Sequence, residues 1–247
     1  MGSSMKMPRA AAALAVAGLW PALAGAQGLE GRWSLAFQGG TDLELSGNVH
    51  EGGTGTVLNL PTSVEARSFG DVYGQGFRAQ LEVGYGVSSA GEVFLRGSYY
   101  KTKSQTLQVG TVAGLVLNAD FADYKEWGGE AGYRRYFRVD KPLKLYVGAL
   151  AGLRFVSELP STFSVPAAGV VLSDVPFYDS STVGVFGADL GISYDLGEKV
   201  ALGLETGPRY QTGLADLEGL AGTGLEPIND TGSRWSMPIL ATLRVRF

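Results

Sequence analysis

The sequence predicts an all-β fold: a closed antiparallel up-and-down transmembrane β-barrel of about eight strands, with long extracellular loops and short periplasmic turns. Apolar and polar residues alternate with period two along several long segments, as in strands that have one apolar face. Short and long connections alternate between these segments, which is the layout of bacterial membrane barrels. Helical periodicity is absent after the first 26 residues.

The N-terminal 26 residues are predicted to be a signal peptide. Lys6 and Arg9 supply the positive charge, an uninterrupted apolar run covers residues 10–20, and residues 24–26 read Ala-Gly-Ala, the pattern that signal peptidase cleaves. The alternative is a membrane-anchoring helix, but this apolar run falls well short of the ~20 residues that a span needs. We therefore expect export, with the barrel domain occupying residues 27–247.

The composition excludes several classes of function. The chain has no cysteine, which rules out disulfides, zinc–thiolate sites, iron–sulfur clusters and a cysteine nucleophile. Its net charge of −4 leaves no basic excess for binding nucleic acid. Glycine is unusually abundant, with 37 residues in 247. This composition is unusual for a soluble enzyme.

Eight segments carry the strand pattern. In the clearest one, Phe77, Leu81 and Val83 lie on one face, and Arg78 and Glu82 on the other. The expected strands cover residues 32–45, 77–87, 92–103, 127–138, 143–155, 185–196, 200–211 and 235–247. Long segments near 46–72, 104–126, 157–183 and 215–233 join alternate pairs. Weak apolar stretches within these loops, at residues 56–60, 112–117 and 167–172, are compatible with strand extensions above the membrane.

The polar face distinguishes a membrane barrel from a soluble one. A soluble barrel exposes a face crowded with charged and hydroxyl side chains, whereas here much of that face is glycine, as a narrow lumen requires. Aromatic residues on the apolar phase gather at the strand ends, as in the two girdles of a membrane barrel. On the loop side they are Phe77, Tyr99, Trp127, Phe155, Tyr210 and Trp235, and on the turn side Trp33, Tyr85, Phe137, Tyr194 and Phe247.

The last strand and two further segments resemble those of a known family. Phe247, preceded by the alternating Leu243 and Val245, resembles the signal that outer-membrane barrels present to their assembly machinery. The segments WGGEAGYRRYF (127–137) and LYVGALAGL (145–153) resemble small outer-membrane proteins of the OmpA-like transmembrane-domain and opacity porin-family type. The resemblance implies a monomer in the outer membrane, in contact with lipopolysaccharide and inserted by the barrel assembly machinery through its last strand.

Charged residues on the polar phase are the candidate site. Both signs occur, and buried charges must be paired, so we expect a network of Arg–carboxylate pairs across the lumen. Its predicted members are Arg78, Glu82, Arg96, Glu130, Arg134, Arg154, Asp189, Glu205, Arg209 and Arg244. The network either plugs the barrel structurally, which we favour, or lines a gated polar pore or proton path.

Enzymatic chemistry is not expected. The single histidine, His50, lies in a glycine-rich loop, and Gly52 stands where a lipid A deacylase would have the serine of its His-x-Ser arrangement. We expect His50 to be solvated rather than catalytic. The long loops are mostly acidic, which fits a solvated surface better than cation bridging to lipopolysaccharide, and they match no calcium-loop template. We expect no cofactor and no metal.

Two functions follow from this pattern. The first is a structural or surface-interaction barrel with a plugged lumen and exposed loops. The second is a small porin-like channel, or an OmpW-like conduit for small or hydrophobic solutes. The apolar loop residues 115–117 and Val170, Val171 and Leu172 offer a hydrophobic entry for such a conduit.

Overall fold

The computed structural model describes residues 28–215, 220, 222–229 and 233–247. The predicted signal peptide lies outside these residues. Among these residues, no helix has the length and hydrophobicity that a membrane-spanning helix needs.

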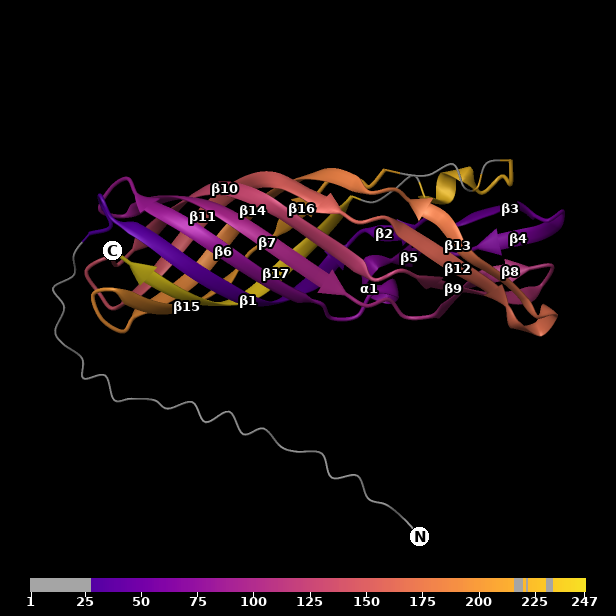
Figure 1. The fold of residues 1–247 in the computed structure, drawn as a ribbon, viewed down its shortest axis with the longest axis horizontal. Coiled ribbons are helices and arrows are strands. Elements are labelled where there is room, and N and C mark those ends of the chain that lie inside the picture. The colour runs from indigo at the N-terminus through magenta and orange to yellow at the C-terminus, as the bar shows by residue number, and fades with distance from the viewer. Residues whose placement is uncertain (1–27, 216–219, 221, 230–232) are drawn as a thin grey trace, which may run out of the picture.

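Eight wall positions form a closed antiparallel barrel, as the sequence predicts (Figure 1). In order around the barrel the strands are β1 (Trp33–Ser46), β6 (Phe77–Gly86), β7 (Gly91–Thr102), β10 (Tyr124–Phe137), β11 (Leu143–Val156), β14 (Ser181–Asp195), β15 (Val200–Thr206) with β16 (Arg209–Gln211), and β17 (Arg234–Arg246). The last strand closes the ring by pairing with the first, from Ser34 opposite Arg246 to Ser46 opposite Trp235. Closure leaves the barrel without a free sheet edge.

The seventh wall position is interrupted, which corrects the prediction of one continuous strand over residues 200–211. β15 ends at Thr206 and β16 begins at Arg209, and both pair with β14 and β17. Gly207 adopts φ +147°, a conformation that favours glycine, and Pro208 has no N–H to give to the ladder. The Pro208 carbonyl still accepts a bond from the Ala188 N–H at 3.1 Å, so the wall bends here without separating.

Side chains alternate between an apolar outer face and a charged interior. Leu95 is 68% exposed, whereas the next residue, Arg96, is 2% exposed. Aromatic pairs lie at both ends of the outer face: Trp127 stacks on Phe155 at 4.4 Å at the loop end, and Trp33 packs on Tyr85 at 4.9 Å at the turn end. An exposed apolar band between aromatic rims is stable in lipid and not in water, so the barrel is of the membrane-spanning kind.

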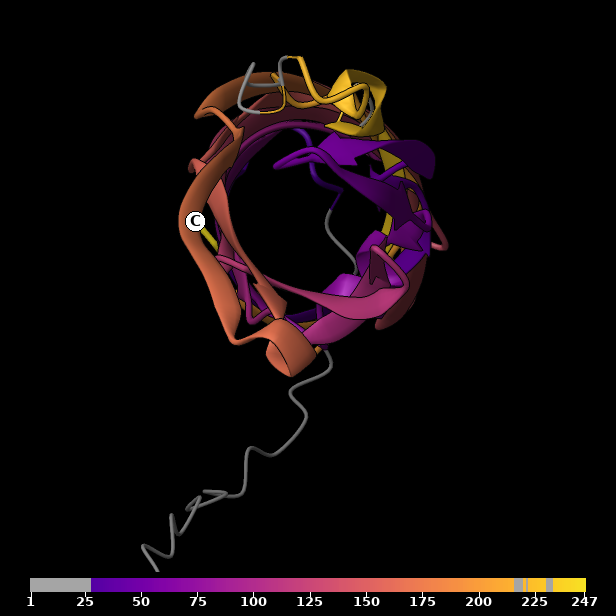
Figure 2. The ribbon, with the colours of Figure 1, turned by 90° about the vertical axis from the view of Figure 1, so that its right-hand side faces the viewer.

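The long segments form a second sheet, which the sequence did not define. Its six antiparallel strands follow the order β13 (Val170–Tyr178), β12 (Leu159–Val165), β9 (Leu115–Phe121), β8 (Leu107–Val112), β4 (Leu60–Val64) and β3 (Gly53–Val57). The apolar stretches at 56–60, 112–117 and 167–172 lie at its hairpin tips. Figure 1 shows this second sheet extending the barrel at its loop end, and Figure 2 shows it following the barrel's round outline.

Shorter elements lie near the junction of the barrel and the second sheet. β2 (Asn48–His50) pairs with β5 (Arg67–Ser68), and the one-turn helix α1 (Phe69–Val72) follows. Ser68 caps α1 by accepting a bond from the Asp71 N–H, and the Asp71 carboxylate bonds back to the Ser68 backbone. The short 3₁₀ turns η1 (Pro166–Ala168) and η3 (Glu226–Asn229) complete the described elements.

Candidate functional site

The ten predicted lumen residues all lie inside the barrel and are at most 3% exposed. At the centre, Arg96 bonds Glu82 at 2.8 Å, Glu205 at 2.8 Å and Asp189 at 3.3 Å. Arg244 reaches the other oxygen of Glu82 at 2.8 Å. Arg154 bonds Glu130 at 2.7 Å, Arg209 pairs with Asp189, and Arg134 pairs with Glu82. The structure therefore joins nine of the ten into one connected set of ion pairs, and Arg78 is linked to them through Glu126, which also bonds Arg154. This set is here called the lumen network.

Eight further charged residues, which the sequence did not assign to the lumen, also lie at the inner side of the wall. Asp42, Glu44, Glu92, Glu126 and Arg234 are bonded into the lumen network. Lys144, Asp195 and Arg246 form a separate set of ion pairs at the turn end, where Asp195 bonds Lys144 at 2.6 Å and Arg246 at 2.7 Å. Glu126 was expected in an acidic loop, but β10 begins at Tyr124, so Glu126 lies inside the barrel and is 1% exposed. Arg234 could have been predicted from the sequence: it directly precedes Trp235, which was expected to face outward, and neighbouring side chains of a strand point to opposite faces.

Glycine on the inward phase makes room for this network. A Cβ at Gly191 would overlap the ring of Tyr146, which lies over this glycine from the neighbouring strand and donates from its hydroxyl to Glu205 at 2.9 Å. The lumen is therefore filled by a few large side chains opposite glycines.

A cluster of buried aromatic residues covers the loop-side end of the lumen network. This aromatic layer consists of Phe69, Tyr73, Tyr100, Phe121, Tyr124, Phe177 and Tyr178, all at most 4% exposed. The Arg234 guanidinium lies 4.5 Å from the Tyr124 ring centre and 5.0 Å from that of Phe69. The lumen network thus contacts the aromatic layer through cation–π interactions of Arg234. On the loop side of the aromatic layer, the interior is apolar.

His50 lies within the aromatic layer, so the expectation of a solvated histidine is wrong. Its side chain is 2% exposed, and its ring stacks on Phe121 at 5.9 Å and meets the edge of Phe177 at 6.2 Å. Burial lowers the pKa of His50 below its usual value of 6.5, and the nearby Arg67 adds to this effect. Two groups of Glu51 raise the pKa of His50: its carbonyl, which lies 3.2 Å from Nδ1, and its carboxylate. This burial has no signal in the local sequence, because the aromatic partners Phe121 and Phe177 lie more than 70 residues away in the chain.

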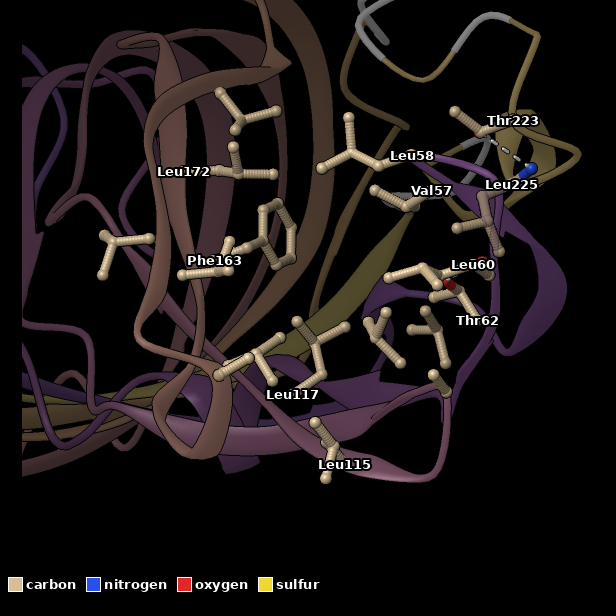
Figure 3. Close-up of a pocket in the computed structure, with 18 of the residues that line it drawn as sticks. Val57, Leu58, Leu60, Thr62, Leu115, Leu117, Phe163, Leu172, Thr223 and Leu225 are labelled. Carbon is tan, nitrogen blue, oxygen red and sulfur yellow. Dashed lines mark hydrogen bonds between the residues drawn. The ribbon is translucent and has the colours of Figure 1, made fainter.

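Beyond the aromatic layer, the second sheet and the segment around η3 line a partly open apolar cavity of about 500 Å³, here called the loop-end cavity. Figure 3 shows Phe163 and Leu172 on one side facing Val57, Leu58 and Leu225 on the other. The hydrophobic entry predicted from residues 115–117 and 170–172 corresponds to part of this wall, through Leu115, Leu117, Val170, Val171 and Leu172. Val116 alone of these lies off the lining and is exposed.

The lining determines what the loop-end cavity can hold. Among the described residues that line it there is no charged side chain, and the polar ones are Thr62, Ser173 and Thr223. Two of these hydroxyls already donate to backbone carbonyls, Thr62 to Leu60 and Thr223 to Leu220. A charged ligand would lose its hydration without a partner here, whereas an uncharged apolar ligand would gain from burial. The volume lies within the range of about 300–1,000 Å³ that is usual for small-molecule sites.

The described residues hold no group of three or more His, Asp or Glu side chains arranged to bind a metal ion. The C-terminal residues predicted as the assembly signal lie on the outer side of the last strand, where Leu243 is 43% and Phe247 is 68% exposed.

Comparison with known proteins finds structural likeness without sequence relatives. No protein-family model and no curated protein sequence matches the chain. Neisserial surface protein A matches over 88% of this chain and 100% of its own, with 17% identity and a TM-score of 0.46. The outer membrane protein OprG from Pseudomonas aeruginosa matches over 90% and 98%, with 12% identity and a TM-score of 0.44. The outer membrane protein AlkL matches over 92% and 95%, with 15% identity and a TM-score of 0.39.

Likeness at this level concerns the fold alone. The closed eight-position barrel of this chain rests on its own strand pairing.

Proposed function

We propose that this chain is an outer-membrane barrel that captures small uncharged apolar molecules in its loop-end cavity. The observation that carries the proposal is the cavity itself: about 500 Å³ of space at the loop end of the barrel, lined by uncharged side chains throughout the part of the chain that the structure describes. Soluble surfaces seldom keep such a large apolar concavity unless a ligand or partner uses it.

The proposal includes a lumen that does not conduct. The ion pairs of the lumen network and the aromatic layer lie one after the other along the interior, from the turn end to the loop end. An apolar molecule would have to displace paired, buried charges to pass through the barrel, at a cost of several kcal/mol for each ion left unpaired. We therefore expect the ligand to be held at the loop end rather than to pass along the lumen.

A matched pair of variants on β9 tests the cavity. Leu117 lines the cavity and is 7% exposed, whereas the adjacent Val116 points away from it and is 44% exposed. Leu117→Trp should fill the cavity, and Val116→Trp should leave it open. The probe is 1-octanol, titrated against the protein in lipid nanodiscs with methyl-labelled Leu and Val.

The expected result is saturable shifts of cavity methyl signals in the original chain and in Val116→Trp, and their loss in Leu117→Trp. The methyl groups of Leu240, a fully buried residue of β17 far from the cavity lining, report any unspecific effect of octanol. Equal shifts in both tryptophan variants, or shifts that do not saturate, would contradict a cavity site.

A surface-interaction role is the second candidate, and the exposed acidic residues of the loop end favour it. Glu51, Glu65 and Glu158 are exposed there. If octanol does not bind and the lumen stays closed, this role becomes the better account, and a search for binding partners should begin with these side chains.

A further inference from the structure

The single histidine of the chain lies where the floor of the loop-end cavity is built. His50 contacts Phe177, and Phe177 lies 6.3 Å from Phe163, whose side chain lines the cavity. The next residue, Glu51, donates its N–H to the Ile228 carbonyl at 2.7 Å, and Ile228 also lines the cavity. Two walls of the cavity are therefore connected to the position of His50.

The pocket around His50 suits only the neutral ring. Nδ1 lies 3.2 Å from the Glu51 carbonyl, and the buried Nε2 has no hydrogen-bond partner among the described residues. A proton on both nitrogens would place a positive charge between Phe121 and Phe177, with no acceptor for Nε2–H. Burying an unpaired charge is costly, so protonation favours an arrangement in which the ring reaches water.

The charged groups near His50 do not compensate for this cost. On β5, its cross-strand neighbour Arg67 is itself positive and is bonded to Glu65 at 2.7 Å and to the Gln108 carbonyl. Glu51 follows His50 in the chain and is exposed. On β9, Asp120 is exposed and accepts a hydrogen bond from the Ser104 hydroxyl. On β13, the Tyr178 hydroxyl donates to the Val49 carbonyl at 2.5 Å. Glu226, on η3, is exposed and accepts from the Gly222 N–H.

We propose that His50 is an acid-sensitive latch of the loop-end cavity: neutral His50 keeps the floor of the cavity packed, here called the closed form, and protonated His50 loosens this floor and releases the ligand. This inference rests on the proposed capture function and adds its regulation. A ligand that binds the closed form must in turn make His50 harder to protonate, because coupling between two sites is reciprocal.

The direction of the pH effect follows from proton counting. Burial lowers the pKa of His50 in the closed form, whereas in a loosened form the ring meets water and its pKa returns toward 6.5. Below that value the loosened form binds more protons, so acidification favours it until the pKa of the closed form is also passed. One proton changes the equilibrium by at most tenfold per pH unit in this window.

The test measures 1-octanol affinity of the full mature chain in nanodiscs at about pH 7.5 and about pH 5.5. We expect the dissociation constant to rise several-fold at the lower pH, up to about tenfold per pH unit. His50→Phe, which fits the aromatic surroundings and does not titrate, should bind equally well at both values. His50→Gln provides a second non-titrating variant if His50→Phe does not fold.

The imidazole NMR signals give an independent readout, since the chain has one histidine. Saturating octanol should move the titration midpoint of His50 to lower pH. Octanol binding that does not change with pH would overturn the latch and leave the capture function standing. A pH effect that persists in both His50 variants would also overturn it, whereas no binding at either pH would instead contradict the proposed function.

Discussion

Glu126 of β10 and Arg234 of β17 are bonded across the barrel at 3.0 Å, although 108 residues separate them in the chain. The same carboxylate accepts from Arg78 at 2.7 Å and from Arg154 at 3.0 Å. Three guanidinium groups from β6, β11 and β17 thus converge on one side chain. Glu126 therefore joins three non-neighbouring parts of the wall through the interior.

Glu126→Gln is expected to destabilise the barrel. The change leaves three buried guanidinium groups with one negative charge fewer, and breaking a buried pair in this way costs about 3–5 kcal/mol. Urea unfolding, followed by the faster migration of the folded, unboiled protein in gel electrophoresis, measures the loss. Glu158→Gln is the control, because Glu158 is exposed just after β11. Equal stability of the two variants would contradict a structural role for the Glu126 pairs.

Gly191→Ala is expected to be destabilising because of close packing in the lumen. The added methyl group would overlap the Tyr146 ring, which is held by Glu205 and by the Arg134 guanidinium 5.3 Å from its centre. Overpacking of this kind costs about 1–3 kcal/mol. At Gly97 a Cβ would meet no atom within 4 Å, so Gly97→Ala should be neutral or slightly stabilising. The measurement compares the urea midpoints of both variants with that of the original chain, and we expect the midpoint to fall in Gly191→Ala and to stay or rise slightly in Gly97→Ala.

The mature protein is expected to be electrically silent in planar bilayers. Arg96 and Arg134 both pair with Glu82 at the centre of the lumen, and all three side chains are at most 2% exposed, so these charges are bonded to one another and not to water. The measurement is single-channel recording after folding has been confirmed by gel migration. Reproducible open steps would assign these side chains to ion selectivity and contradict the plugged lumen.

Phe247→Ala should impair assembly in cells more than folding in detergent. The Phe247 backbone exchanges two bonds with Trp33, at 3.0 and 3.1 Å, and these survive the substitution, while the exposed ring makes only a small contribution to barrel stability. We expect a several-fold lower amount in the outer membrane and an unchanged urea midpoint. A clear fall in the urea midpoint, together with the lower amount in the membrane, would mean that the ring acts through stability and not as an assembly signal.

Period-two alternation determined the barrel wall and its two faces. A strand places successive side chains on opposite sides, so the sequence alone assigned Leu81 to the outside and Glu82 to the lumen. The predicted strand boundary was wrong at Glu126, because β10 begins three residues before the predicted strand, although the alternation itself continues through Glu126. The strand prediction also failed at Gly207 and Pro208, where the backbone leaves the ladder although the flanking residues keep the strand pattern.

The arrangement of the long segments depends on contacts between distant parts of the chain. Val57, Leu117 and Leu172 come from three different loops, and their short apolar stretches carry no periodic signal that says which of them will pair. Barrel closure brings the ends of these loops onto one rim, where their strands join into a second sheet and their apolar side chains line a cavity. His50 is buried for the same reason: Phe121 and Phe177 reach it only after the wall has closed. Local sequence determined which side each wall residue faces, and long-range pairing determined which loops meet.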